Sequence, residues 1–161
     1  MRRYIPFLVL TFVLVGCVTD NNANTVARYK SREKNDVEER RDLLAGKWLS
    51  NSLVKEGGSK MTLNQRSPDG TYVLTIRVVM PDDRIVVSQE YGVWGLSGNI
   101  YFTKMQGRIE SGQKVPCNGR DSYYDDAYFV KRLTADEFDI ETVTNGEWGS
   151  MKKVPDDYGL P

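Results

Sequence analysis

Apolar and polar residues alternate along much of the chain, most regularly in one segment. In "TYVLTIRVVM", residues 71–80, every second residue from Tyr72 to Met80 is apolar. Alternation over this length predicts a strand with one buried face. The turn-forming sequences "SPDG" before it and "PDD" after it mark its two ends.

The same period of two predicts an all-β fold. Short turns join most of the predicted strands, so neighbours in sequence pair as antiparallel hairpins, and the longest connection is "SGQKVPCNGRDS". Such strands remove their exposed edges by closing on themselves. We therefore predict an eight-stranded antiparallel up-and-down barrel, with room inside for side chains or one small ligand. A sandwich of two sheets is the alternative. The eight strands are predicted near residues 46–55, 60–66, 71–80, 84–95, 99–109, 124–133, 137–144 and 147–154.

A helix is predicted before the first strand. The segment "SREKNDVEERRDLLAG" is rich in helix formers, offers Ser31 or Asn35 as N-cap, and ends at Gly46. Val37 and Leu44 lie on one narrow apolar stripe. We expect a short helix that packs on the domain, with a partner-binding helix as the alternative.

The N-terminus carries an apolar run that is too short to cross a bilayer. The run from Ile5 to Val15 has 11 residues, whereas a spanning helix needs about 20. Arg2 and Arg3 precede the run and the small Gly16 follows it, which is the layout of a cleaved secretory signal. We predict that residues 1–16 are a signal peptide.

The end of this signal, Leu14, Val15, Gly16 and Cys17, resembles the lipobox of bacterial lipoproteins. The resemblance implies that a signal peptidase recognises Leu14, Val15 and Gly16, and that Cys17 carries a diacylglyceryl group and palmitate-like acyl chains. Two or more such chains hold a protein firmly on a bilayer. Val18 replaces the aspartate of the inner-membrane retention signal, which implies an outer-membrane lipoprotein facing the periplasm. The inner membrane and the cell surface are alternative locations, and an ordinary signal with a chance cysteine is an alternative reading.

The rest of the chain divides into three parts. We predict a lipidated cysteine with a flexible tether at 17–31, because "VTDNNANT" is polar and lacks periodicity. The barrel domain with its helix then occupies residues 32–155, and 156–161 form a C-terminal tail.

Composition narrows the classes of function. Without the signal the chain has 20 basic and 22 acidic residues, which argues against a nucleic-acid-binding face. No histidine occurs, which removes the usual general base and histidine-based zinc sites. We therefore expect no enzyme, no metal site and no cofactor. The alternative is an envelope enzyme that uses Cys117 or a carboxylate pair; the pairs are Asp82 with Asp83, Asp125 with Asp126, Asp136 with Glu137, and Asp156 with Asp157.

In "LLAGKWLSN", Gly46, Lys47 and Trp48 resemble the glycine-x-tryptophan signature of lipocalins. The resemblance implies that Trp48 closes one end of the barrel and that a basic residue of the last strand, Lys152 or Lys153, crosses its ring. The second signature of that family is absent, and "DDAY" at 125–128 is only a loose echo of it. Specific ligand chemistry is therefore not transferred.

Two charged residues are candidates for ligand contact. Lys104 continues the phase of Ile100 and Phe102, and Arg132 continues the phase of Tyr128 and Val130. If both point inward, they could meet the acidic head group of a ligand. We expect a membrane-anchored lipoprotein that binds a small apolar or amphipathic ligand or an envelope protein; a structural assembly lipoprotein is a further alternative.

Overall fold

The computed structural model describes residues 21–54, 57–117 and 125–161 of the chain. In this described part of the chain, one helix, α1 (Asn21–Leu44), precedes nine strands. The strands are β1 (Gly46–Leu53), β2 (Ser59–Arg66), β3 (Thr71–Val79), β4 (Ile85–Ser97), β5 (Ile100–Glu110), β6 (Gln113–Pro116), β7 (Asp125–Leu133), β8 (Glu137–Thr142) and β9 (Trp148–Val154).

Eight of these strands form a closed antiparallel barrel. The hydrogen-bonded order is β4-β3-β2-β1-β9-β8-β7-β5, and β4 also pairs with β5, which closes the ring. The predicted eight-stranded barrel is thereby confirmed, and each predicted strand begins within one residue of an observed one. Strand β6 was not predicted. It forms a hairpin with the far half of β5, and its four residues are too few to show a period.

Helix α1 is longer than predicted. It begins at Asn21 rather than at Ser31 or Asn35, so the prediction of a flexible tether over 17–31 is wrong from Asn21 onward. The segment is polar, which indicates exposure, but it contains neither glycine nor proline and can continue the helix. Cys17 lies outside the described residues.

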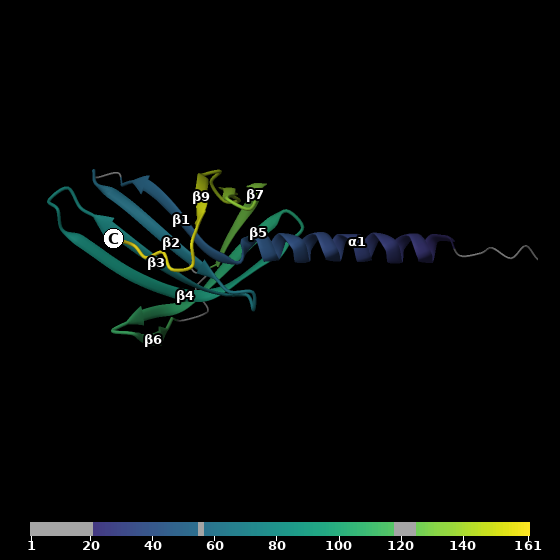
Figure 1. Ribbon diagram of the computed structural model, residues 1–161, viewed down its shortest axis with the longest axis horizontal. Coiled ribbons are helices and arrows are strands. Elements are labelled where there is room, and N and C mark those ends of the chain that lie inside the picture. Colours follow the sequence, from purple (N-terminus) through teal and green to yellow (C-terminus); the bar gives the residue numbers. More distant parts are fainter. Residues whose placement is uncertain (1–20, 55–56, 118–124) are drawn as a thin grey trace, which may run out of the picture.

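The helix projects from one end of the barrel and touches it only near its last turns (Figure 1). There Arg40 donates a hydrogen bond from Nη1 to the carbonyl of Gly98 at 2.6 Å, and Leu44 is fully buried. With 24 residues, the helix is about 36 Å long. Its first residue, Asn21, therefore lies far from the barrel (Figure 1).

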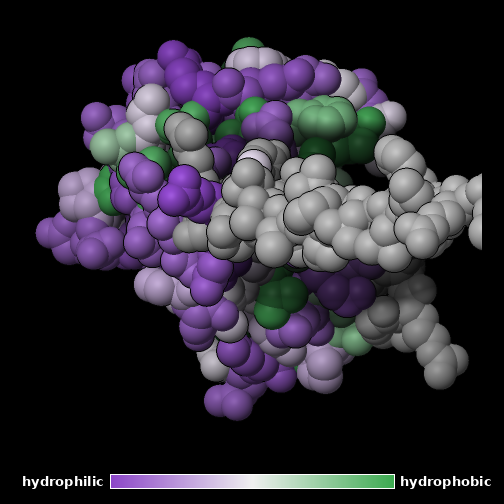
Figure 2. All heavy atoms as spheres, turned by 90° about the vertical axis from the view of Figure 1, so that its right-hand side faces the viewer, coloured by the Kyte–Doolittle hydropathy of each residue, from purple (hydrophilic) through white to green (hydrophobic). Residues whose placement is uncertain are grey.

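The core lies at the helix end of the barrel. Inward-facing side chains of six strands and the last turn of α1 fill this end with aromatic and aliphatic groups. Figure 2 looks at this end from outside; the described residues show a mainly hydrophilic surface with small separate hydrophobic patches. The large apolar side chains at this end are thus mostly buried inside, where they close the barrel. The buried members are Leu44, Trp48, Tyr72, Trp94, Leu96, Tyr101, Val130, Phe138 and Ile140.

Candidate functional site

The closed end is held by Trp48 and Lys153. The Trp48 ring is fully buried, and its Nε1 donates to the carbonyl of Leu44 at 2.9 Å. Lys153 donates from Nζ to the carbonyl of Leu43 at 2.9 Å, and this Nζ lies 5.3 Å from the centroid of the Trp48 ring. Both bonds satisfy carbonyls at the end of α1, where a positive charge is also favoured by the helix dipole.

Of the other residues predicted to close the barrel, Gly46 packs at the closed end and Lys152 does not. At Gly46 the backbone has φ +107°, and a Cβ there would lie 3.1 Å from Cε of Lys153, so a side chain would be strained and crowded. Lys152 is exposed and lies beside Glu137 on the outer face. Of the two candidate lysines, the structure therefore places Lys153 over the tryptophan.

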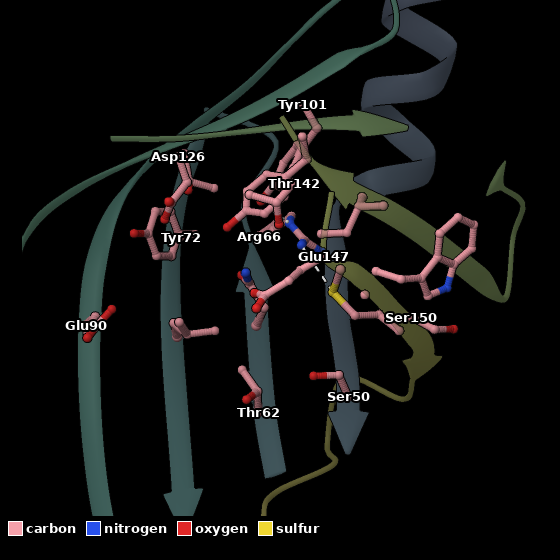
Figure 3. Close-up of a pocket in the computed structure, with 18 of the residues that line it drawn as sticks. Ser50, Thr62, Arg66, Tyr72, Glu90, Tyr101, Asp126, Thr142, Glu147 and Ser150 are labelled. Carbon is pink, nitrogen blue, oxygen red and sulfur yellow. Dashed lines mark hydrogen bonds between the residues drawn. The ribbon is translucent and has the colours of Figure 1, made fainter. Parts of the chain in front are cut away.

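Beyond this floor, the barrel encloses an open cavity of about 530 Å³, within the range of small-molecule sites. Figure 3 shows Arg66 and Tyr101 at the end near α1, with Ser50 and Thr62 farther along the strands. Most of the lining residues carry a polar or charged side chain, the three tyrosines included. The lining residues are Ser50, Lys60, Thr62, Asn64, Arg66, Tyr72, Leu74, Glu90, Tyr101, Thr103, Met105, Asp126, Tyr128, Ile140, Thr142, Glu147, Trp148, Gly149, Ser150 and Met151.

Arg66, from the end of β2, is the buried charge of this cavity. It is only 2% exposed, and its guanidinium lies 5.0 Å from the ring centroid of Tyr101 and 5.1 Å from that of Phe138. Its Nε donates to the Tyr101 hydroxyl at 2.9 Å, and its Nη2 donates to Sδ of Met151 at 3.6 Å. Nη1 has no hydrogen-bond partner among the described residues, and no carboxylate of that part of the chain pairs with Arg66. A buried, uncompensated cation with a free donor favours an anion.

An acidic side lies across the cavity from Arg66. Figure 3 shows Asp126, Tyr72 and Glu90 together on that side. Burial raises the pKa of the Asp126 carboxyl above its ordinary value of 3.8, although a hydrogen bond from the Tyr128 hydroxyl opposes this. Burial and then the nearby Glu90 charge raise the pKa of Tyr72, and burial and then Asp126 raise the pKa of Tyr128. Both phenols therefore stay protonated and act as donors at neutral pH.

The structure places neither predicted ligand contact in the cavity. Lys104 faces outward and forms an ion pair with Asp125 at 3.1 Å, because its phase mates on β5 are outward and Tyr101, Thr103 and Met105 are the inward set. Arg132 also faces outward, because a bulge between Val130 and Arg132 adds one residue and reverses the alternation.

Outside the barrel, Arg132 has a structural role. Its Nη2 lies 2.7 Å from Oδ2 of Asp139, whose side chain is 5% exposed, and its Nη1 lies 2.9 Å from Glu137. Because Asp139 is buried on the outer side of β8, this ion pair compensates its charge. The prediction that Arg132 meets a ligand inside the barrel is therefore wrong.

Cys117 and the acidic pairs were the candidates for catalysis. Cys117 is half-buried and its Sγ donates to the carbonyl of Met105 at 3.5 Å. Of the acidic pairs, only Asp126 lines the cavity, while Asp82 binds Arg84 at 2.6 Å in a turn. Within the described ranges, no group of three or more metal-binding side chains occurs. No described helix is long and apolar enough to cross a bilayer.

Arg66 was not predicted as a site residue, because the alternation along β2 suggests the wrong inward face. In "SKMTLNQR" the apolar Met61 and Leu63 alternate with polar residues, which predicts that the polar set faces water. In the structure the polar set, including Asn64 and Arg66, faces the cavity. Leu63 is buried yet lies outside the main core cluster. The only available signal was an arginine at the end of a predicted strand beside a turn.

Comparisons with solved structures find proteins of similar shape, and one of them is a lipocalin-like protein. No model of a known protein family matches the sequence, and no curated protein matches it. A crystal structure of a lipocalin-like protein from Bacteroides uniformis superposes with a TM-score of 0.42 and 16% identity, covering 70% of this chain and 99% of that one. At this level of similarity we take nothing about ligands from that protein, and the barrel assignment rests on the strand pairing.

Proposed function

We propose that this protein is a non-enzymatic binding protein whose barrel holds a small amphipathic molecule by its carboxylate group. The observation that carries the proposal is Arg66, which lines the deep end of the cavity with one nitrogen unpaired. Since a guanidinium binds a carboxylate through charge-assisted hydrogen bonds, such a ligand supplies the missing acceptor. Lys60, the other cation of the described lining, is on β2 near the end away from α1, so the one guanidinium at the deep end matches a singly charged group better than a doubly charged phosphate.

The remainder of the cavity supports an amphipathic ligand rather than a purely apolar one. Leu74, Met105 and Ile140 offer apolar contact for a short chain, while Thr62 and Ser50 line the other end. A ligand with apolar and polar segments therefore fits the lining better than a hydrocarbon does.

Calorimetry with octanoate as probe tests the proposal. The full-length protein is placed in lipid nanodiscs, with empty nanodiscs as blank and octan-1-ol as the uncharged probe. We expect octanoate to bind and octanol to bind at least tenfold more weakly. Arg66→Met should remove the preference for the carboxylate, whereas Arg132→Met, which alters an arginine outside the barrel, should keep it. No octanoate binding, or equal binding by Arg66→Met, would contradict the proposal.

The variant Arg66→Met is expected to fold. It removes the hydrogen bond to Tyr101, but it also removes a buried donor without a partner, which by itself costs about 1–3 kcal/mol. The urea midpoint of unfolding of Arg66→Met should therefore be close to that of the unaltered protein. Loss of binding with unchanged unfolding separates a binding role from a structural one.

We further propose that acyl chains on Cys17 anchor the protein to the outer membrane, with the barrel in the periplasm. The lipobox resemblance of Leu14 to Cys17 supports this. Because β1 starts at the end of α1 and runs away from it, Leu53 and the row of residues paired with it lie at the end of the barrel away from α1. Mass spectrometry of protein extracted from native cells should find residues 1–16 removed and acyl mass on Cys17; an intact leader would contradict the anchor.

Binding of an envelope protein is a second candidate function, favoured by an exposed apolar rim. Leu53 is 87% exposed, and Ile85, Val86 and Val87 are each more than half exposed. Strand pairing puts Leu53, Ser59, Val79 and Ile85 in one row at the barrel end away from α1. Clustered exposed apolar groups are typical of interaction sites. In-cell crosslinking from position 86 should capture an envelope protein if this rim is a docking site, and no crosslinked partner would contradict it.

A further inference from the structure

The cavity carries charges of both signs, and they occupy separate places. Arg66 lies on β2, whereas Glu90 and Asp126 lie on β4 and β7. Neither carboxylate forms an ion pair with a described residue, and Lys60, which also lines the cavity, pairs with neither of them. The cavity thus holds the unpaired Arg66 at its deep end and the unpaired Glu90 and Asp126 on another wall, and Lys60 and the exposed Glu147 also line it.

The strand register gives the separation of these two charged places. Glu90 pairs with Leu74 of β3, and Leu74 pairs with Asn64 of β2, which lies two residues before Arg66. Two strand spacings and two residues along a strand put the Cα atoms of Arg66 and Glu90 about 12 Å apart. Because both side chains project into one cavity, their charged groups lie within reach of a single small molecule (Figure 3).

Gly92 brings the acidic wall together. Tyr72 pairs with Gly92, and a Cβ at Gly92 would lie 2.7 Å from Cε1 of Tyr72. Because Gly92 has no side chain, the Tyr72 ring can lie over β4 toward Asp126. Figure 3 shows Tyr72 beside Asp126. The two carboxylates thereby flank a phenol.

Asn64 adds an unpaired acceptor between the two places. It is 8% exposed, and its Oδ1 is buried without a partner among the described residues. A buried acceptor of this kind is costly unless a donor reaches it. The Asn64 acceptor and the carboxylates of Glu90 and Asp126 therefore favour a ligand that carries hydrogen-bond donors.

We propose that the ligand is a zwitterion, with a carboxylate held by Arg66 and a protonated amine held by Glu90 and Asp126. This inference rests on the proposed function and extends it. Each charge of the ligand would compensate a charge that the barrel leaves unpaired, so that burial of both partners becomes favourable. A simple fatty acid would compensate Arg66 but leave both carboxylates without an opposite charge.

The test compares acids that differ only in a terminal amine. The probes are octanoate with 8-aminooctanoate and hexanoate with 6-aminohexanoate, titrated into the full-length protein in nanodiscs. With bond lengths of about 1.5 Å, the charges of extended 8-aminooctanoate are about 10 Å apart, and those of the shorter acid are closer. We expect the better of the two amino acids to bind at least tenfold more tightly than its parent acid.

A double variant supplies the matched control. In Glu90→Gln with Asp126→Asn, the amine should lose its advantage while the parent acid binds at least as well as before, because only the acidic wall has changed. Octylamine should bind the unaltered protein more weakly than 8-aminooctanoate.

The outcomes separate the two proposals. If neither amino acid binds better than its parent acid, or if the double variant keeps the advantage, the zwitterion is refuted. The carboxylate site still stands in that case, provided that octanoate binding depends on Arg66. If no probe binds, a cavity filled only by water is indicated and both proposals fail.

Discussion

Replacing Lys153 by methionine tests how the barrel is closed. Methionine keeps most of the apolar stem but removes the ammonium, which donates to the Leu43 carbonyl at 2.9 Å and lies 5.3 Å from the Trp48 centroid. A hydrogen bond from a charged group contributes about 1.5–3 kcal/mol, a cation over an aromatic ring about 0.5–2 kcal/mol, and a cation at a helix C-terminus about 0.3–1 kcal/mol. Because Lys153 is only half-buried and these contributions overlap, we expect the free energy of unfolding to fall by about 2 kcal/mol.

Urea unfolding followed by circular dichroism measures this loss. With a slope of about 2 kcal/mol per M, the midpoint should fall by about 1 M. Lys152→Met is the matched control, since Lys152 is exposed on the other face of the same strand, and exposed substitutions change stability by about 0.5 kcal/mol or less. Equal midpoints for the two variants would refute the closure by Lys153.

Three further predictions concern the wall of the barrel. Gly92→Ala should lower the free energy of unfolding by about 2 kcal/mol or more, because its Cβ would meet the Lys104 carbonyl and the Tyr72 ring. Arg132→Ala should cost about 1–2 kcal/mol by leaving Asp139 buried and unpaired, less than a fully buried pair because Arg132 is half exposed, and should leave octanoate affinity unchanged. Because burial raises the pKa of Tyr72 and Tyr128 above 10.0, the unfolded chain releases these protons first, so stability should fall as the pH rises above about 10.

Each of these predictions has a control and a contrary outcome. Gly159→Ala should be neutral, since nothing lies within 4 Å of a Cβ there, and equal stability of the Gly92 and Gly159 variants would contradict the close packing. Weaker octanoate binding by Arg132→Ala would indicate that Arg132 contacts the ligand and would contradict its place outside the barrel. Tyrosinate absorbance measures the phenols directly. If all tyrosines of the folded protein titrate near pH 10, the burial of Tyr72 and Tyr128 is contradicted.

The order and type of the strands were predictable because they depend on local pattern. Alternation of period two with short turns predicted eight strands, and hairpin connections fix the antiparallel pairing of sequence neighbours. The resemblance of Gly46 and Trp48 to the glycine-x-tryptophan signature, rather than a local pattern, implied which end is closed. The start of α1 was missed, because polarity indicates only that a segment is exposed and not whether it is helical.

The candidate site was not predictable in the same way. Lys104 and Arg132 were chosen because they share an alternation with apolar neighbours on their strands. When both faces of a strand carry apolar side chains, this alternation does not show which face is inside. On β5 the inward set is the other one, and on β7 a bulge reverses the set after Val130. On β2 the apolar residues face outward and Arg66 faces inward.

The sequence by itself determined the eight barrel strands and their antiparallel order, because period and turn length act over a few neighbours, and the resemblance of Gly46 and Trp48 to the lipocalin signature implied which end closes. Only the tertiary structure decided which face of each strand lines the cavity, and hence that Arg66 lies opposite Glu90 and Asp126. The physical reason is that inside and outside are defined by ring closure and bulges. These depend on strands far apart in sequence, so that one added residue exchanges the two faces.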